Sequence, residues 1–414
     1  MFETIIDTIN TFLYSKLLIV ILIGSGIYFT IRTRFPQVRL FRKACNAVME
    51  KPEGKESVSS FQALMVSTAS RVGTGNIVGV SSAICIGGVG SVFWMWIIAI
   101  LGSASALAES TLAQIYKKKG EDGKCYGGPA YYIEAALHSR GLAVVFCIAM
   151  ILTYAFGFNM LASYNLQSTF AGQPFYNADI TPWIIGGILA LVMGWCLLGG
   201  GNRIVKVTST LVPFMGIAYI LVSLLVVVLN IGQLPSVMAQ IFKEAFDFKA
   251  IFAGFAGSAM MQGIRRGLYS NEAGIGSAPN AAASAVVSHP VKQGLVQMLS
   301  VFIDTLLLCT ATAMMCLVSG VIPAKELQGA PWVQAALHKT LGSFGPYFIM
   351  IAMVLFAFTT LLGNCFYCDN LLTYIHKKQP DRKFMTGFRI VSALAVFWGA
   401  GMEMTLLWHI SDVL

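Results

Sequence analysis

Long apolar stretches follow one another along almost the whole chain, separated by short polar segments. A helix needs about 20 apolar residues to cross the hydrocarbon core of a bilayer. The pattern predicts such helices near residues 13–31, 59–86, 91–116, 142–169, 182–199, 204–230, 250–268, 293–320, 343–375 and 385–403. A further helix begins near residue 404, and we expect it to be truncated because the sequence stops at Leu414.

Composition agrees with this pattern. Of the 414 residues, 56% are hydrophobic and 11% are charged, and the mean hydropathy is +0.72. Soluble domains carry about 25% charged residues. The chain is therefore expected to be an all-α polytopic membrane protein. The first span follows no basic segment and precedes no small-residue cleavage site, so we expect it to stay as a helix rather than to be a signal peptide.

Basic residues are concentrated in every second loop between the predicted helices. All but six of the 28 Lys and Arg residues fall in loops that this helix order places on one side of the membrane. The exceptions are Arg71 within a span and, on the opposite side, Lys16, Lys243, Lys249, Lys325 and Lys339. Because cytoplasmic loops carry the excess of Lys and Arg, the rich face is expected to be cytoplasmic and the N-terminus to lie outside. The net charge of +9 is then explained without a nucleic-acid partner.

Two of the predicted helices are interrupted by glycines near their middle, at residues 71–76 (RVGTGN) and 253–258 (AGFAGS). Such glycines are tolerated at membrane depth where the freed backbone faces a cavity or a ligand. A matching pair in the two halves of a chain points to a substrate site. Close helix packing is the alternative. The spacing Gly-x-Gly, with Thr74 and Asn76 as flanking polar residues, favours binding in the first stretch.

A break at Gly73 and Gly75 would produce two half-helices whose ends meet. Amides at the start of one half can hold a carboxylate, and unwound carbonyls can coordinate a cation. In the second stretch, Phe255 either caps a small substrate or packs in the core. The two breaks lie five spans apart, so residues 59–230 and 250–414 are expected to form two inverted repeats of one transport domain, after an extra helix at 13–31.

Other polar residues also lie within the spans. Thr359 and Thr360 offer hydroxyl oxygens of the type that a Na⁺ site uses, although most such threonines bond back to their own helix. Charges at membrane depth are costly and therefore suggest function. They are Arg71, Glu109, Asp304, Asp369 and Glu403. For Glu109 and Asp304 we expect a structural or gating role, through pairing with Arg71, Arg265 or Arg266.

Catalytic and metal-binding patterns are absent from the sequence. Cys365 and Cys368 form a close pair, which we interpret as two small apolar residues on one helix face rather than a redox motif. No nucleophile, acid–base pair or nucleotide-binding loop is found, so neither an intramembrane enzyme nor a primary pump is expected. A channel would use similar helices without a coupled ion.

Several long motifs occur in an order that resembles the alanine or glycine:cation symporter family, the amino acid carrier proteins or sodium:alanine symporters. They are RVGTGNIVGV at 71–80, GGVGSVFWMW at 87–96, YGGPAYYIE at 126–134, RGLYSNEAGIGSAPNAA at 266–282 and HPVKQGLVQMLSVFIDT at 289–305. The likeness runs from about residue 12 to the end.

The resemblance implies a leucine-transporter-type fold, with two inverted five-helix repeats after one N-terminal helix, in the cell membrane. It implies import of a small neutral amino acid with Na⁺ by alternating access, without an organic cofactor. We expect a monomer surrounded by membrane lipid. Carried over by motif, the substrate residues would be Thr74, Gly75, Asn76, Gly254, Phe255 and Gly257. The sodium ligands would be the hydroxyls of Thr359 and Thr360 and the carbonyls of Ala69 and Val72.

Two positions depart from the family pattern. Asn159 to Leu161 is followed by Ala162, where the family often has Gln, and Asn364 stands where some members have Trp. Both changes are expected to enlarge or repolarise the pocket, and Asn364 is therefore added to the substrate residues. A larger neutral amino acid, or H⁺ in place of Na⁺, stays open.

Overall fold

The structure is a computed structural model of the chain, and it describes residues 17–50, 58–120, 123–247, 258–403, 406–408 and 411. Within this part, regular structure is helical apart from one antiparallel hairpin of β1 (Lys118–Lys119) and β2 (Cys125–Tyr126).

The long helices follow the predicted spans to within a few residues wherever the chain is described. They are α2 (Leu18–Arg32), α5 (Ser60–Arg71) with η2 (Thr74–Asn76) and α6 (Val78–Gly87), α7 (Ser91–Ile115), α9 (Arg140–Ile151) with η3 (Leu152–Gly157) and α10 (Phe158–Ser168), α11 (Thr181–Leu198), α12 (Gly200–Leu229), α15 (Ala259–Asn271), α17 (Pro290–Val301) with η6 (Phe302–Cys309) and α18 (Thr310–Val318), α20 (Phe344–His376) and α21 (Arg382–Ala400). Among the described helices, 6 are long and apolar enough to cross a membrane. The all-α membrane fold is confirmed.

Short helices that hydropathy does not predict fill the connections. They are α3 (Pro36–Arg39), α4 (Phe41–Val48), α8 (Pro129–Leu137), η4 (Ile231–Gln233), α13 (Leu234–Ala245), α16 (Ala278–Ala282), η7 (Lys325–Leu327) and α19 (Ala330–Leu341). Each is too short to produce a membrane-length apolar run, which explains why the hydropathy pattern reads these segments as loops.

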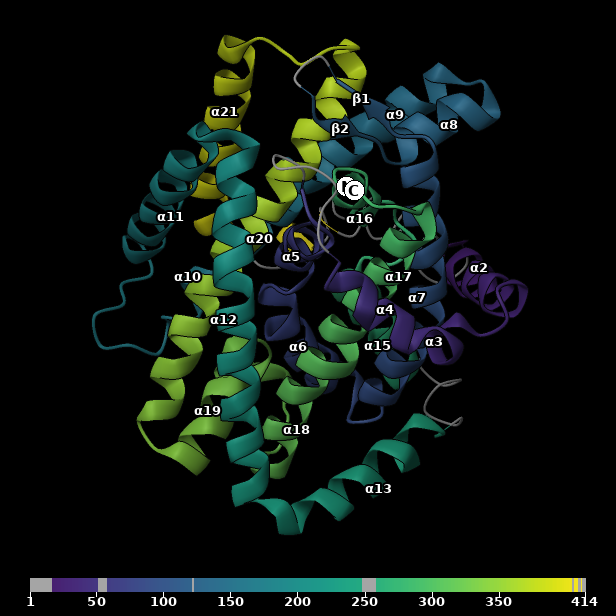
Figure 1. Ribbon diagram of the computed structural model, residues 1–414. Helices are drawn as coiled ribbons and strands as arrows, with labels where there is room; N and C mark the ends of the chain where they lie inside the picture. Colours follow the sequence, from purple (N-terminus) through teal and green to yellow (C-terminus); the bar gives the residue numbers. More distant parts are fainter. Residues whose placement is uncertain are drawn as a thin grey trace.

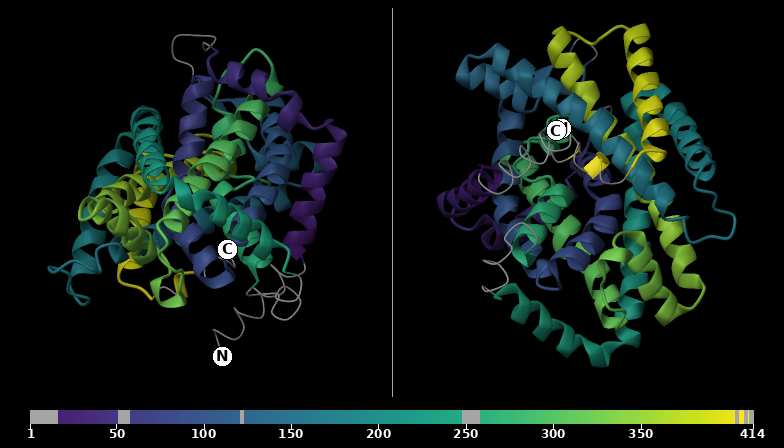
Figure 2. Two further views of the ribbon diagram at one scale, coloured as in Figure 1. Left: turned by 90° about the horizontal axis from the view of Figure 1, so that it is seen from below. Right: turned by 180° about the vertical axis from the view of Figure 1, so that it is seen from behind.

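The interrupted helices lie at the centre of the molecule. Figure 1 shows α5, α6, α15 and α17 in the middle, α2 and α7 on one side, and α10, α11 and α12 on the other. The α13 helix runs across one end, and α8 with the hairpin lies at the opposite end, as the views in Figure 2 also show. The buried run from residue 63 to residue 85 therefore has protein on all sides.

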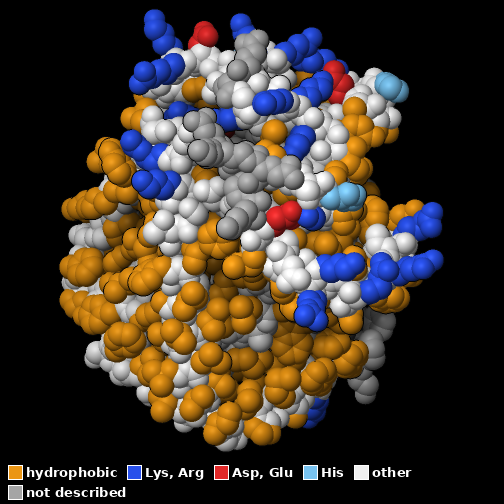
Figure 3. Space-filling model, viewed as in Figure 1, with side chains coloured by type: hydrophobic (Ala, Val, Ile, Leu, Met, Phe, Trp, Pro, Cys, Tyr) orange, Lys and Arg blue, Asp and Glu red, His pale blue; other side chains and the backbone are white. Residues whose placement is uncertain are grey.

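The outer surface is divided into an apolar region and a basic end. Side chains of Leu191, Phe214 and Trp195 on the outer helices are 76%, 67% and 66% exposed. Figure 3 shows apolar atoms over the lower and left parts, Lys and Arg gathered at the end that carries α8, β1 and β2, and a second group of Lys and Arg at the right, level with α2, α3 and α4. This distribution suits a helix bundle whose sides face lipid and whose basic end faces water.

Candidate functional site

The span at residues 59–86 is broken where the sequence predicts. A capping box starts α5: Ser59 Oγ accepts from Gln62 N (3.1 Å), and Gln62 Oε1 accepts from Ser59 N (2.9 Å). The helix ends at Arg71 because Val72 (φ −77°, ψ 85°) and Gly73 (φ −138°, ψ −154°) leave helical geometry. The single turn η2 then leads into α6.

Gly73 brings the break against α20. A Cβ at this position would overlap Thr360 Oγ1, so the close approach requires glycine. The Thr360 hydroxyl is buried and has no hydrogen-bond partner among the described residues. The Thr359 hydroxyl turns elsewhere, donating to Leu355 O (2.9 Å) and lying 3.5 Å from Met215 Sδ on α12. Of the two threonines, the structure places Thr360 at the break.

Backbone groups on both sides of the break lack partners within the described chain. The amides of Thr74 and Gly75 have no acceptor among the described residues, and the first-turn amides of α6, likewise unpaired in this part of the chain, follow them. The carbonyls of Ala69 and Val72 have no donor in the part of the chain that the structure describes. Free amides at a helix N-terminus attract anions, and free carbonyls at a helix C-terminus attract cations. One short segment can thus bind groups of both charges.

The Asn76 side chain clamps the break. Its Oδ1 accepts from Gly73 N (2.9 Å), and its Nδ2 donates to Asp304 Oδ1 (2.7 Å) on η6. Asp304 is fully buried and also accepts from Ser270 Oγ (2.9 Å) and Thr305 Oγ1 (2.7 Å). Both ends of the Asn76 amide are therefore used by protein groups, and the free donors of the break are backbone amides.

Thr74 and Gly75 face two other helices. Asn165 Nδ2 on α10 donates to Thr74 Oγ1 (3.1 Å). A Cβ on Gly75 would lie 2.9 Å from Tyr269 Cε1 on α15. The Tyr269 ring packs edge-on against Phe158, with centroids 5.0 Å apart. An aromatic wall therefore stands beside Gly75.

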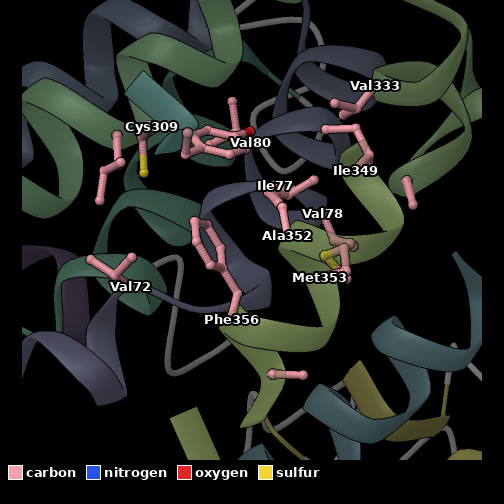
Figure 4. Close-up of a cluster of buried hydrophobic side chains, with 14 of the residues drawn as sticks. Val72, Ile77, Val78, Val80, Cys309, Val333, Ile349, Ala352, Met353 and Phe356 are labelled. Carbon is pink, nitrogen blue, oxygen red and sulfur yellow. The ribbon is translucent and has the colours of Figure 1, made fainter. Parts of the chain in front are cut away.

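An apolar wall covers another side of the break. Ile77 and Val78 pack with Ala352, Met353 and Phe356 of α20, as Figure 4 shows. All five residues are buried. Water is excluded on this side, so polar interactions made at the break are strengthened.

The second glycine-broken stretch lies outside the described residues, so Gly254, Phe255 and Gly257 stay predictions. The described chain resumes at Ser258, whose hydroxyl accepts from Met261 N (3.3 Å) and caps α15. This helix packs on α6 and α7 and carries Tyr269 to Gly75. The described half of the second interrupted helix therefore reaches the first break.

Asn364 belongs to a buried chain of polar contacts between α10, α20, α5 and the segment after α15. Its Nδ2 donates to Asn159 Oδ1 (2.9 Å), and its Oδ1 lies 2.6 Å from Ser70 Oγ. The same Ser70 Oγ lies 2.9 Å from Glu272 Oε1, and Glu272 Oε2 accepts from Ser277 Oγ (2.7 Å). Protein groups thus hold the Asn364 amide on both sides.

Glu272 is a buried polar residue of the site region that the sequence pattern does not single out. It follows α15 with a left-handed backbone (φ 51°) and is 2% exposed. The available signal was an acidic residue within SNEAGIGS, directly after a predicted span. In the sequence alone, this segment is recognisable only as a family motif.

The two expected gating carboxylates form no ion pair within the described chain. Glu109 instead accepts from the amides of Gly274 (3.3 Å) and Gly276 (3.1 Å). Asp304 accepts from the neutral side chains of Asn76, Ser270 and Thr305. Arg71 Nη1 lies 3.4 Å from Gln297 O and Oε1, while Nε and Nη2 have no partner among the described residues. The expected direct pairing with Arg71 is not formed, because amide and hydroxyl donors already occupy the carboxylates.

The remaining charged residues lie away from the break. Asp369 Oδ2 pairs with Arg389 Nη2 (2.8 Å), which ties α20 to α21. Glu403 follows α21 and is exposed. At the basic end, the pKa of Glu134 is lowered, first by a hydrogen bond from the Tyr374 hydroxyl (2.6 Å) and further by Arg140. These pairs join neighbouring helices and do not contribute to the site.

A family model described as the sodium:alanine symporter family matches residues 1–414. The chain belongs to this family. Bacillus subtilis GlnT, a probable sodium/glutamine symporter, is 43% identical over 414 residues, covering 99% of this chain and 85% of GlnT. Bacillus subtilis YrbD, a putative sodium/proton-dependent alanine carrier protein, is 42% identical over 421 residues, covering 98% and 86%. The sodium/alanine symporter AgcS of Methanococcus maripaludis is 36% identical over 419 residues, covering 100% and 91%.

The fold is also similar to a solved structure. MhsT in complex with L-phenylalanine matches with a TM-score of 0.56 and 14% identity, covering 84% of this chain and 81% of that chain. This confirms the leucine-transporter-type fold. Family membership makes the protein an amino-acid:cation symporter of the membrane and not an enzyme.

Proposed function

We propose that this sodium:alanine symporter family member imports a small neutral amino acid of the alanine or glycine class together with Na⁺, by alternating access across the cell membrane. The observation that carries the proposal is the break in the span 59–86, where amides and carbonyls that are unpaired within the described chain meet. The inverted repeats, 59–230 and 250–414, and an external N-terminus belong to the same proposal.

The substrate carboxylate binds the free amides of Thr74 and Gly75. These amides lie at the start of α6, where the helix dipole also favours an anion. Asn76 holds the break in shape through Gly73 and Asp304. Gly254, Phe255 and Gly257 would cover the substrate from the second broken helix, as the family motif implies.

Sodium binds between the carbonyls of Ala69 and Val72 and the hydroxyl of Thr360. The support is that all three oxygens are buried and unpaired within the described chain. Buried polar groups normally have a partner, so a set of orphaned oxygens suits a cation. Thr359 would join the site only after its hydroxyl turns away from Leu355.

A larger neutral amino acid is the second candidate substrate. The relative GlnT is described as a probable sodium/glutamine symporter. Ala162 on α10 is a small, buried residue where the family often has Gln, so this wall offers more room. Hydrogen-bonded Asn364 would then shape the pocket rather than fill it as Trp would.

The experiment is uptake of labelled alanine into proteoliposomes, in competition with a panel of unlabelled amino acids, with a Na⁺ gradient or with choline. We expect accumulation that needs Na⁺ and stops when a sodium ionophore collapses the gradient. Inhibition by alanine and glycine, but not by glutamine, supports the first candidate, and strong inhibition by glutamine supports the second. If labelled alanine only reaches equal concentrations on both sides, and its uptake does not depend on Na⁺, the protein would be a channel and symport would be contradicted.

A further inference from the structure

The single hydroxyl hydrogen of Ser70 faces two acceptor oxygens. Its Oγ lies 2.6 Å from Asn364 Oδ1 and 2.9 Å from Glu272 Oε1, and both of these oxygens are acceptors if Glu272 is ionised. The orientation of Asn364 follows from its Nδ2, which donates to Asn159 Oδ1. A hydroxyl has one hydrogen. A second hydrogen, on Glu272, would give every contact a donor.

The charges around Glu272 also require a positive group. The groups that act on it or on its neighbours come from every helix packed here: Arg71 on α5, Glu109 on α7, Asp304 on η6, Tyr154 on η3 and Tyr367 on α20. Among the described residues, three buried carboxylates therefore share one guanidinium. Burying unbalanced charge is costly, so protons or cations must be taken up.

Unpartnered polar atoms converge on the same place. Arg71 Nε and Nη2 and the hydroxyls of Tyr154 and Tyr367 have no hydrogen-bond partner among the described residues. These side chains are 2%, 0% and 0% exposed. The Tyr154 hydroxyl is next to Ser277 and the Tyr367 hydroxyl is next to Ser70, the two serines that bond Glu272. The two phenol rings pack edge-on, with centroids 5.5 Å apart.

A proton suits this cluster better than a metal ion. In the described part of the chain, no three His, Cys, Asp or Glu side chains could hold a metal together. The neighbours of Glu272 are hydroxyls and a guanidinium, and the guanidinium would repel a metal ion. Hydroxyls can reverse direction, so they can serve Glu272 in both its protonated and its ionised form.

We propose that Glu272 binds a proton and that this proton and Na⁺ at the break exclude each other. The inference rests on the sodium site proposed above and adds a second ion to it. Ser70, which touches Glu272, directly follows Ala69, whose carbonyl belongs to that site. Ionised Glu272 attracts Na⁺ in a buried site and protonated Glu272 does not, so each ion weakens the binding of the other. When Na⁺ binds, the O–H bond of the Glu272 carboxyl breaks, the electron pair stays on the carboxylate and the proton leaves to water.

The experiment is calorimetric titration of NaCl into the purified full-length protein in detergent, at pH 6 and pH 8, with choline chloride as the salt control. Repeating it in two buffers of different ionisation enthalpy counts the protons released per Na⁺. We expect the Na⁺ dissociation constant to be about tenfold higher at pH 6 than at pH 8, with proton release at pH 6, which lies within the limit of about 100-fold that linkage to one proton sets over two pH units.

Glu272→Gln should bind Na⁺ with one affinity at both pH values and release no proton. Glu109→Gln is the matched control, because backbone amides already satisfy that carboxylate, and its proton release should stay. If Glu272→Gln does not fold, Asn364→Leu gives an independent test with the carboxylate in place. It removes the competing acceptor, so the Ser70 hydrogen serves Glu272 alone and the proton release should fall.

The results distinguish a failure of the sodium site from a failure of the proton site at Glu272. If wild-type protein shows no Na⁺ heat at either pH, the sodium site itself is wrong. Na⁺ binding with equal affinity at both pH values and no proton release keeps the sodium site and overturns the proton site. If release persists in Glu272→Gln or disappears in Glu109→Gln alone, the proton sits elsewhere and the assignment to Glu272 is wrong.

Discussion

Asn76 acts on the site through the shape of the break, because its amide bonds Gly73 on one side and Asp304 on the other. Its removal leaves a backbone amide and a buried carboxylate without their partner. Each loss of this type costs about 1–3 kcal/mol. The residue therefore matters for the positions of the amides at Thr74 and Gly75, even though its own side chain is occupied.

We expect Asn76→Ala to weaken substrate binding by about 5- to 150-fold, at about 1.4 kcal/mol per factor of ten. Na⁺ affinity should change less, because the carbonyls of Ala69 and Val72 precede the clamp. The measurement is the half-saturating substrate and Na⁺ concentration for uptake, in protein that elutes as a folded species. Asn165→Ala is the control, since it removes a bond to the Thr74 side chain only. Unchanged substrate affinity in Asn76→Ala would contradict the clamp.

The two threonines of α20 allow a direct comparison of a free hydroxyl with a bonded one. Thr360 Oγ1 is unpaired within the described chain, whereas Thr359 bonds back to Leu355. Thr360→Val should raise the half-activating Na⁺ concentration by about tenfold or more, the effect of losing about 1–3 kcal/mol. Thr359→Val should change it by less than about threefold, below 1 kcal/mol. Sodium activation of uptake measures both, and a larger effect at Thr359 would show that Thr360 is not the ligand.

At the scale of helices, the contact between the break and α20 depends on the missing side chain of Gly73. We expect Gly73→Ala to destabilise the protein by about 1–3 kcal/mol, the usual cost of overpacking. Gly79→Ala lies in the same span, where an added Cβ meets nothing within 4 Å, and should be neutral or slightly stabilising. Thermal unfolding in detergent gives both values.

A second variant separates packing from ion binding at this contact. Gly73→Ala combined with Thr360→Ala removes the overlapping hydroxyl, so it should regain most of the lost stability. It should not regain sodium activation, because the proposed ligand is gone. Full recovery of sodium-dependent uptake would mean that the contact serves packing only.

Helix positions could be predicted because the apolar runs match the thickness of a bilayer. The break at Gly73 could be predicted because glycines and polar residues replace the apolar residues expected there. Short connecting helices such as α13 and α19 could not be predicted from hydropathy, because packing against neighbouring helices stabilises them rather than a long apolar run.

The orientation of individual side chains could not be predicted from the sequence either. Thr359 and Thr360 are adjacent and chemically identical, and the packing of α20 decides which one faces the break. Tyr154 and Asp304 lie in the π-helical segments η3 and η6, whose extra turn width re-aims side chains and which occur mostly at functional sites. Nothing in the local sequence marks these segments.

At the scale of the whole molecule, the distribution of charge predicts how the bundle sits in the membrane. Figure 3 shows Lys and Arg at the end that carries α8 and the hairpin and at the right beside α2, α3 and α4, with an apolar surface over the lower part of the molecule. The α13 helix lies across the opposite end in Figure 1. Because positively charged loops stay in the cytoplasm, the α13 end should face outward.

Thiol labelling in intact cells tests this orientation. Cys45 on α4 is exposed and Cys125 on β2 is half-buried, and both lie on the predicted cytoplasmic side. With both changed to Ser, Gly232→Cys places a thiol in the turn before α13, where an added Cβ meets nothing within 4 Å. A membrane-impermeant maleimide should label Gly232→Cys in intact cells, whereas it should label Cys45 of the native chain only after permeabilisation. The reverse pattern would place the N-terminus inside and overturn the topology, since every loop is linked to the others by the same helix count.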